Sequence, residues 1–256
     1  MGSPRLAVMA ANRVGFQVME FLADTGTEIS VVVLHREDPG NYNEAIRLLC
    51  KNAPKIRAVT EIEHMEDADL VEQLKSARPQ LGILAWWPKI LKGSIISIPE
   101  RGWLNFHPSF LPYNRGKHPN FWCLVDETPC GVTLHYVNDG VDSGEIVAQR
   151  QFKVSWEDTG ETVHRKSCEH IVDLFKERFD DILSGTSPHL PQAEGEGTFH
   201  LAKEIDAASK IDLDRTYTAR RLFNLIRART FAPNPTAFFV DNGIKYAVTI
   251  QISERS

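Results

Sequence analysis

The sequence of 256 residues is poor in the features that mark several special classes of protein. It has four cysteines, Cys50, Cys123, Cys130 and Cys168, and no two of them form a C-x-x-C pair. This spacing argues against a zinc site and against a framework of disulfides, and it favours a reducing compartment. We expect each cysteine to be a small core side chain rather than a nucleophile.

Long apolar runs and an excess of positive charge are also missing. Residues 1–5 contain no apolar run of signal-peptide length, and no later segment is long enough to span a bilayer. The formal net charge is -5, which argues against electrostatic binding of nucleic acid by the whole chain. We therefore expect a cytoplasmic protein that binds neither nucleic acid nor membrane.

The loop after the first predicted strand lacks the glycines of a dinucleotide-binding fingerprint. Residues 10–15 read AANRVG, so Gly15 stands alone where such a fingerprint would be G-x-G-x-x-G. A Rossmann dinucleotide cofactor is therefore not expected. Asn12 and Arg13 open the following helix, where they either contact an anionic substrate or are simply solvated. We take both as candidate substrate contacts.

Strand and helix patterns alternate through the first half of the chain. Short β-branched runs predict strands at residues 6–10, 28–34, 56–59, 80–85 and 102–106, and apolar periodicity predicts helices at 13–23, 42–51 and 67–77. Such alternation implies right-handed crossovers and a parallel sheet that helices cover on both faces. The predicted fold class is α/β, with a Rossmann-like domain and a mostly parallel sheet.

The second half is less regular and predicts a small additional subdomain. A loop at 108–116 precedes a predicted helix at 119–126, antiparallel strands at 131–137 and 145–154, and a long helix at 162–183. Residues 184–197 are rich in Gly, Ser, Pro and Glu, which indicates a connector. A helix at 216–227 and a hairpin of 236–240 with 244–252 follow. We predict a catalytic domain at 1–185 and a β-rich C-terminal subdomain at 198–256.

The segment Asn105-Phe106-His107-Pro108-Ser109 is the most informative motif of the chain. Alternate residues of a strand point the same way, so Asn105 and His107 can face one pocket while Leu104 and Phe106 face the core. Pro108 ends regular pairing because it has no N–H. The two polar groups therefore lie at the carboxyl end of a strand, where α/β sheets build their sites.

A carboxylate follows about thirty residues later, in the acidic turn VNDGVDSG at residues 137–144. An amide, an imidazole and a carboxylate together suit acyl transfer, because they can stabilise an oxyanion and transfer protons. Asp139 and Asp142 are both candidates for the carboxylate. The alternative is an Asn–His pair whose hydrogen bonds are made within a loop, with the aspartate capping a turn. His135 and His164 are expected to serve structure rather than catalysis.

With these motifs, the chain resembles the N10-formyltetrahydrofolate-dependent formyltransferases. This family includes glycinamide ribonucleotide, methionyl-tRNA and amino-sugar formyltransferases, and the related deformylases. The resemblance is strongest over residues 81–183, and it implies that Asn105, His107 and Asp142 are the catalytic set. Residues 227–233, RARTFAP, resemble the sugar-modifying branch more weakly.

The resemblance also implies a formyl donor, N10-formyltetrahydrofolate, and no metal. The loop after the strand at 80–85 matches the pterin pocket of the family, and two tryptophans there suit a flat heteroaromatic ligand. One of the two indoles is expected to be core. The candidate cofactor contacts are Trp86, Trp87, Ile90, Leu91, Val137 and Val141.

The acceptor that the resemblance favours is an amine of a nucleotide-linked amino sugar, as in polysaccharide biosynthesis. The purine-pathway branch has a glycine- and serine-rich loop that residues 10–15 lack, and a tRNA acceptor would need a large basic C-terminal domain. The same motifs allow two alternative functions. One is hydrolysis of the formyl donor, and the other is a non-catalytic role in binding folate or nucleotide. Arg115, Lys117, Arg227 and Phe231 are the further candidate substrate contacts, and a homodimer is an expected assembly.

Overall fold

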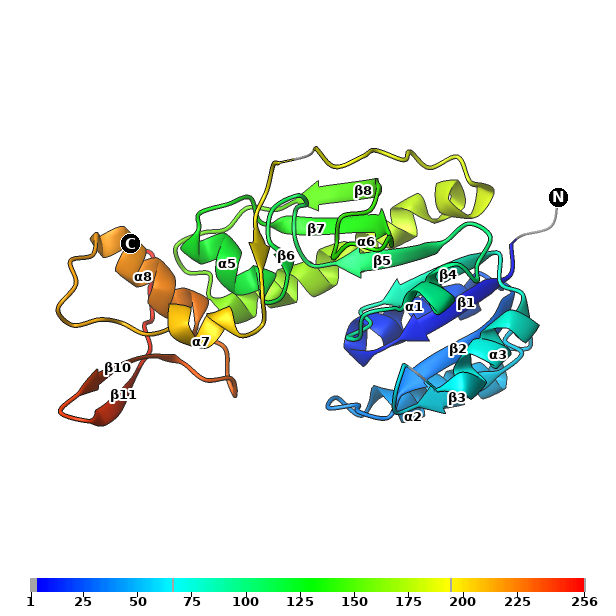
Figure 1. The fold of residues 1–256 in the computed structure, drawn as a ribbon, viewed down its shortest axis with the longest axis horizontal. Coiled ribbons are helices and arrows are strands. Elements are labelled where there is room, and N and C mark those ends of the chain that lie inside the picture. Colours follow the sequence, from blue (N-terminus) through cyan, green and yellow to red (C-terminus); the bar gives the residue numbers. More distant parts are fainter. Residues whose placement is uncertain (1–3, 66, 194, 256) are drawn as a thin grey trace. The chain divides into compact units, whose positions relative to one another are not determined.

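A computed structural model describes residues 4–65, 67–193 and 195–255 of the chain (Figure 1). The elements of the first half are β1 (Leu6–Ala10), α1 (Asn12–Asp24), β2 (Ile29–His35), α2 (Tyr42–Asn52), β3 (Val59–Ile62), α3 (Ala68–Ala77), β4 (Leu81–Ala85), α4 (Gly93–Ile96) and β5 (Trp103–His107). Those of the second half are β6 (Arg115–Gly116), α5 (Pro119–Val125), β7 (Gly131–Tyr136), β8 (Ile146–Gln151), α6 (Gly160–Ser184), β9 (Phe199–His200), α7 (Glu204–Ala208), α8 (Ala219–Ala228), β10 (Ala237–Asp241) and β11 (Ile244–Val248). Within the described residues, no helix is both long and apolar enough to cross a membrane.

Seven strands form one sheet in the order β3-β2-β1-β4-β5-β7-β8. β1 pairs in parallel with both β2 and β4, and the pairs β2–β3 and β4–β5 are parallel as well. Every residue of β1, β2 and β4 is buried, which is typical of parallel strands with both faces covered. The predicted α/β fold with a mostly parallel sheet is confirmed.

A tryptophan fixes the start of β5, the strand that carries the N-x-H motif. Trp103 is fully buried, and its indole N–H donates to the carbonyl of Ile95 at 2.9 Å. A Cβ at Gly82 on the neighbouring β4 would lie 2.2 Å from the Trp103 ring. Only glycine leaves room for the ring there, so the indole lies directly on the backbone of β4.

The chain divides into two compact units, and each is described by itself. The first comprises Met1–His107, Leu134–Ala148 and Ile171–Pro191, and the second comprises Pro108–Thr133, Gln149–His170 and Gln192–Ser256. β7, β8 and α6 contribute residues to both units. In the first unit, Phe21 of α1 packs edge-on against Phe175 and Phe179 of α6.

The predicted C-terminal hairpin is present, but its second strand ends at Val248 rather than at residue 252. β10 and β11 pair antiparallel with Asp241 opposite Ile244, so that Asn242 and Gly243 form a two-residue turn. Both turn residues have positive φ, 47° and 79°, which is the conformation that Asn-Gly turns favour. α8 begins after Thr218, whose hydroxyl accepts a hydrogen bond from the N–H of Arg221 at 3.2 Å and so caps the helix.

The predicted third strand was placed too early. The apolar residues at 56–59 predict it there, but Ile56 forms only an isolated bridge with Ile29, and the ladder with β2 runs from Val59. Residues 59–62 read VTEI and carry a single charge, Glu61, which lies on the outer strand of the sheet and pairs with Arg36 and Arg47. Such charges are common on edge strands.

Four short elements escape the sequence patterns: α4, β6, β9 and α7. A two-residue strand or a helix of one turn is too short to show periodicity. β6 lies within the predicted loop at 108–116. It pairs in parallel with β9, with Arg115 opposite Phe199, after the predicted connector. The predicted loop is therefore held by a segment that is distant in the sequence.

One expectation about the cysteines is wrong. Cys123 and Cys130 form a disulfide with their Cα atoms 5.6 Å apart, across the short turn that joins α5 to β7. Their seven-residue separation is not a recognised spacing, so the pairing arises from the turn rather than from the sequence. Cys50 is a buried core residue as expected, and burial raises the pKa of its thiol to about 11.

Candidate active site

β5 delivers an amide and an imidazole to the same side of the sheet. Leu104 and Phe106 are buried at 0% and 3% exposure, and Phe106 packs against Phe175 at 5.0 Å between ring centroids. Asn105 and His107 occupy the alternate positions and therefore project together from the opposite face. His107 is itself only 5% exposed, so its ring lies within the fold rather than in solvent.

A tight turn between β7 and β8 presents the carboxylate of Asp142. Asp142 has φ of 50°, and a Cβ at Gly144 would lie 1.8 Å from the carbonyl oxygen of Tyr136. The amide oxygen of Asn138 accepts hydrogen bonds from the N–H of Gly140 and the hydroxyl of Ser143, both at 3.0 Å. These bonds hold the turn in the conformation that places Asp142 inward.

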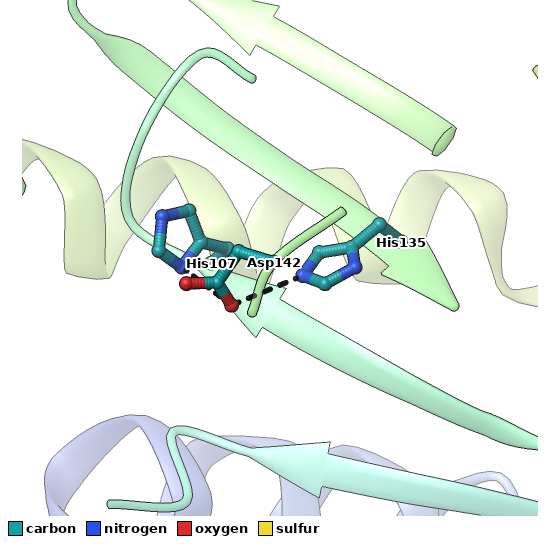
Figure 2. Close-up of side chains that lie close together, drawn as sticks. All are labelled: His107, His135 and Asp142. Carbon is teal, nitrogen blue, oxygen red and sulfur yellow. Dashed lines mark ion pairs between the residues drawn. The ribbon is translucent and has the colours of Figure 1, made fainter. Parts of the chain in front are cut away.

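The carboxylate lies between two imidazole rings (Figure 2). Asp142 Oδ1 is 3.4 Å from His107 Nδ1 and 3.6 Å from His135 Nε2. The amide Nδ2 of Asn105 is 3.5 Å from the same oxygen and 3.1 Å from His135 Nε2. The first unit therefore brings Asn105, His107 and Asp142 together, and a fourth side chain joins them.

His135 is the member of this cluster that the sequence patterns did not place in the site. Its Nδ1 lies 2.9 Å from the carbonyl oxygen of Tyr136, so Nδ1 carries the proton and donates it. With the Nδ1 proton engaged in this way, Nε2 can accept a hydrogen bond from the Asn105 amide, 3.1 Å away. Its position could have indicated a place in the site, because His135 lies near the carboxyl end of β7 and two residues before the acidic turn.

The cluster has the composition of a proton-transferring, oxyanion-stabilising centre. His107 can donate to a developing negative charge, Asp142 can accept a proton, and the amide of Asn105 offers a further donor. The ligand atoms of His107, His135 and Asp142 also lie within 4.8 Å of one another, a spacing at which three groups could bind a metal ion. That no metal takes part stays a prediction.

The predicted cofactor residues divide between core and surface. Trp87 and Leu91 are 8% and 6% exposed and belong to the core cluster against which Val137 packs. One of the two indoles is therefore core, as expected. Trp86 is half-buried, and its φ of 60° turns the chain sharply at the end of β4.

Two of the predicted cofactor residues are exposed hydrophobic side chains. Ile90 is 72% exposed and Val141, next to Asp142, is 42% exposed. Contiguous exposed apolar patches often mark binding sites, whereas single exposed apolar side chains are common on any protein. The exposure of Ile90 and Val141 fits the predicted role in donor binding, which stays a prediction.

The predicted substrate residues of the first unit open α1. Asn12 has φ of 58° directly after β1, and Arg13 is exposed. A Cβ at Gly15 would lie 3.0 Å from the backbone of Ala10, so this single glycine serves close helix–strand packing. Substrate contact by Asn12 and Arg13 stays a prediction.

Two further predicted substrate residues, Arg115 and Arg227, belong to the second unit. The Nε–H of Arg115 is buried without a hydrogen-bond partner among the described residues, and its Nη2 donates to the carbonyl of Glu196 at 3.4 Å. Arg227 is 8% exposed and donates to the carbonyls of Ser155 and Asp158 at 2.6 and 3.0 Å. The guanidinium of Arg227 therefore binds α8 to the loop at residues 155–158.

Lys117 and Phe231 also lie in the second unit. The backbone N–H of Lys117 donates to the carbonyl of His200 at 3.0 Å. Phe231 packs beside His164, with ring centroids 5.2 Å apart, and burial lowers the pKa of that histidine. His164 therefore has a packing contact, while its structural role and substrate contact by Lys117 and Phe231 stay predictions.

Comparison with known proteins identifies the family. Residues 24–177 match the family model described as formyl transferase, which spans more than half of the chain. The chain belongs to the formyl transferase family. Residues 204–254 match a second model, described as the N-formyltransferase dimerization C-terminal domain. Membership of the family agrees with the Asn105–His107–Asp142 cluster and with the resemblance that the sequence motifs carry.

A relative by sequence supports this family, and a solved structure shares the fold. The methionyl-tRNA formyltransferase of Thermodesulfovibrio yellowstonii is 30% identical over 257 residues, covering 97% of this chain and 78% of the relative. The structure of a 4-N formyltransferase from Francisella tularensis superposes with a TM-score of 0.82 at 21% identity, covering 98% of this chain and 99% of that chain.

A third similar protein is the N-formyltransferase from Helicobacter canadensis. It superposes with a TM-score of 0.70 at 18% identity and covers 93% of this chain and 84% of that one. At such identities, the two structural similarities establish a shared fold. The chemistry assigned to this member of the family therefore has to come from its own residues.

Proposed function

We propose that the protein transfers a formyl group from N10-formyltetrahydrofolate to the amine of a nucleotide-linked amino sugar. The observation that carries this proposal is the cluster of Asn105, His107 and Asp142 in a member of the formyl transferase family. An amide donor, an imidazole and a carboxylate in one cluster meet the needs of formyl transfer to an amine.

The reaction begins with a neutral amine, because an ammonium has no lone pair. Its nitrogen attacks the formyl carbon, and the carbonyl oxygen becomes an oxyanion that protonated His107 and the amide of Asn105 stabilise. Asp142 supports the imidazolium through Nδ1, 3.4 Å away, and accepts the amine proton directly or through water. Collapse then breaks the bond between carbon and N10, and N10 takes up a proton.

His107 is oriented for this role. Its Nδ1 faces Asp142, and its other ring nitrogen points away from the carboxylate (Figure 2). We assign that Nε2 as the atom that donates to the oxyanion. Asn105 Nδ2 has two hydrogens, one directed at His135 and one at Asp142. The contact with Asp142 is long for a hydrogen bond, at 3.5 Å. A charged formyl oxygen could therefore replace Asp142 as the acceptor of this hydrogen.

The donor site is proposed at the loop after β4 and the turn that carries Asp142. Trp86 and the exposed side chains of Ile90 and Val141 supply an aromatic and apolar surface, while Trp87, Leu91 and Val137 support it from the core. The Helicobacter canadensis N-formyltransferase is known in complex with folinic acid, a folate. This supports a folate donor for the present chain.

The acceptor is proposed to contact Arg115, Lys117, Asn12 and Arg13. Arg115 has no carboxylate partner among the described residues and keeps a buried N–H unsatisfied, so its guanidinium suits an anionic ligand. The Helicobacter canadensis protein is in complex with dTDP-3-aminofucose, a nucleotide sugar. Residues 10–15 lack the glycine-rich phosphate loop, which argues against a monophosphate acceptor.

Formylation of methionyl-tRNA is the second candidate function, and a specific observation favours it. The relative from Thermodesulfovibrio yellowstonii carries that name and is 30% identical. Against it stand the net charge of -5 and the match of residues 204–254 to a dimerization domain. A tRNA ligand usually requires a strongly basic surface.

Comparison of acceptors tests the proposal. The enzyme is incubated with N10-formyltetrahydrofolate and, separately, with a panel of nucleotide amino sugars, methionyl-tRNA and glycinamide ribonucleotide, and the products are read by mass spectrometry. We expect one formyl group to be added to a nucleotide amino sugar. Formylation of methionyl-tRNA or glycinamide ribonucleotide, with none of the sugars modified, would refute the proposed acceptor.

The organisation of the whole chain is proposed on the same basis. A catalytic domain at residues 1–185 and a C-terminal subdomain at 198–256 are supported by the two family models, which match 24–177 and 204–254. The name of the second model and the exposed side chains of Val240, Ile244 and Tyr246 support a homodimer. A cytoplasmic location and a role in polysaccharide biosynthesis complete the proposal.

A further inference from the structure

A short segment after the connector lies along the loop that contains Arg115. The backbone N–H of Arg115 donates to the carbonyl of Thr198 at 3.0 Å, and the N–H of Lys117 donates to the carbonyl of His200 at 3.0 Å. These bonds make the parallel pair of β6 and β9 (Figure 1). Arg115 Nη2 also donates to the carbonyl of Glu196, so the same segment contacts both its backbone and its guanidinium.

Thr198 makes the most specific contact between the two segments. Its hydroxyl accepts a hydrogen bond from the N–H of Asn114 at 2.8 Å and donates to the side-chain oxygen of Asn114 at 3.0 Å. The Asn114 amide donates in turn to the hydroxyl of Thr128 at 2.8 Å. Asn114 is fully buried with φ of 57°, a conformation that needs such support.

Two glycines allow the segments to approach this closely. A Cβ at Gly116 would lie 2.2 Å from the carbonyl oxygen of His200, and a Cβ at Gly197 would lie 2.0 Å from that of Pro112. Gly197 also has φ of 88° and Gly116 of 90°, which only glycine adopts readily. Both segments can therefore approach each other closely enough for direct backbone pairing.

His200 fixes the far end of the segment. Its imidazole stacks on the indole of Trp122 at 3.8 Å between centroids. Nε2 lies 3.0 Å from a carboxylate oxygen of Asp126, and Nδ1 lies 3.5 Å from one of Glu204. The segment is thus attached to α5 and α7, so that it can hold the loop at 114–117 rather than merely follow it.

We infer that Thr198 is a positioning residue for acceptor binding, because it holds the loop that presents Arg115 and Lys117. The inference rests on the proposed function, since it needs Arg115 and Lys117 to contact the acceptor. It gives Thr198, a residue outside the catalytic motifs, a role in selecting the acceptor. The proposed donor site is built from the loop after β4 and the Asp142 turn, which Thr198 does not support.

Steady-state kinetics with Thr198→Val test this inference. The valine keeps the shape of the side chain and removes both hydrogen bonds to Asn114. We expect the KM for the acceptor to rise about tenfold, the effect of losing one well-placed interaction, while the KM for N10-formyltetrahydrofolate stays near that of the wild type. Thr198→Ser keeps the hydroxyl and should restore the acceptor KM.

A matched control and a structural measurement complete the test. Thr186→Val removes a hydroxyl that bonds Ser184 on an exposed surface, and it should leave both KM values unchanged. Hydrogen–deuterium exchange should show faster exchange at Asn114, Arg115 and Lys117 in Thr198→Val, and wild-type rates in Thr198→Ser. If Thr198→Val does not fold, Thr128→Val, which removes the second support of Asn114, should raise the acceptor KM in the same selective way.

An unchanged acceptor KM in a folded variant would overturn the inference, as would an equal rise in both KM values that Thr198→Ser fails to reverse. The kinetics use whichever acceptor the wild-type enzyme formylates. Failure of the proposed function is therefore visible separately, as a wild-type enzyme that formylates no nucleotide amino sugar. In that case the exchange rates alone still decide whether Thr198 holds the loop.

Discussion

Asp142 Oδ1 is shared among three neighbours, and this sharing defines the chemistry of the site at the scale of single residues. His107 and Asn105 approach it from β5, and His135 approaches it from β7. In the proposed mechanism, this one carboxylate both orients the His107 imidazole and accepts a proton from the amine. We expect His135 to orient the Asn105 amide through its Nε2, 3.1 Å away.

Replacement of His135 tests that orienting role. His135→Phe keeps a ring of similar size and removes the acceptor for the Asn105 amide, so we expect kcat to fall by roughly 10- to 100-fold. The KM for the folate should change little, because His135 contacts the amide rather than the donor. A kcat equal to that of the wild type would show that Asn105 is held without His135.

Removal of metal distinguishes proton transfer from metal-dependent chemistry at the cluster of His107, His135 and Asp142. If His107, His135 and Asp142 act through protons, dialysis against a strong chelator should leave kcat unchanged. Zinc and other divalent ions added back should not raise it. A chelator-treated enzyme that is inactive until a metal is restored would assign the cluster to metal binding instead.

At the scale of elements, the turn between β7 and β8 matters most because it sets the position of Asp142. Gly144→Ala would place a Cβ 1.8 Å from the carbonyl oxygen of Tyr136, so the turn has to move. We expect kcat to fall by about 100-fold, as for a displaced catalytic group, without loss of the fold. Gly93→Ala, at a helical glycine with open space, is the control and should be fully active. Wild-type activity in Gly144→Ala would contradict this account of the turn.

The elements also show how far the sequence could predict the site. The alternation of β5 predicts that Asn105 and His107 share a face, and the acidic turn supplies the candidate carboxylates. Local periodicity cannot report which distant strand lies beside β5, so the contact of His135 with Asn105 was not predicted. For the same reason, the pairing of β6 with β9 and the disulfide of Cys123 with Cys130 were missed.

At the scale of the whole molecule, two histidines link stability to pH. Burial lowers the pKa of His118, with added repulsion from Arg229 and Lys117, and burial also lowers the pKa of His164. A histidine with a lowered folded-state pKa binds protons more readily when unfolded. Its contribution to stability is therefore present above the ordinary pKa of 6.5 and is lost as the pH falls below it.

Urea denaturation should reveal this loss directly. We expect the free energy of unfolding to be lower at about pH 5.5 than at about pH 7.5. The double variant His118→Gln and His164→Gln should show a smaller difference between the two conditions, because glutamine does not titrate. An equal pH dependence in the variant and the wild type would exclude both histidines as its source.

The central claim is that Asn105, His107 and Asp142 form the catalytic centre of a formyl transferase. It is tested most directly by the rate of formyl transfer in His107→Asn and Asp142→Asn, measured together with the folate affinity of each variant. We predict that both substitutions lower kcat by at least about 100-fold, with folate binding and circular dichroism close to those of the wild type. Rates within a few-fold of the wild type in both variants would contradict the assignment of this cluster as the active site.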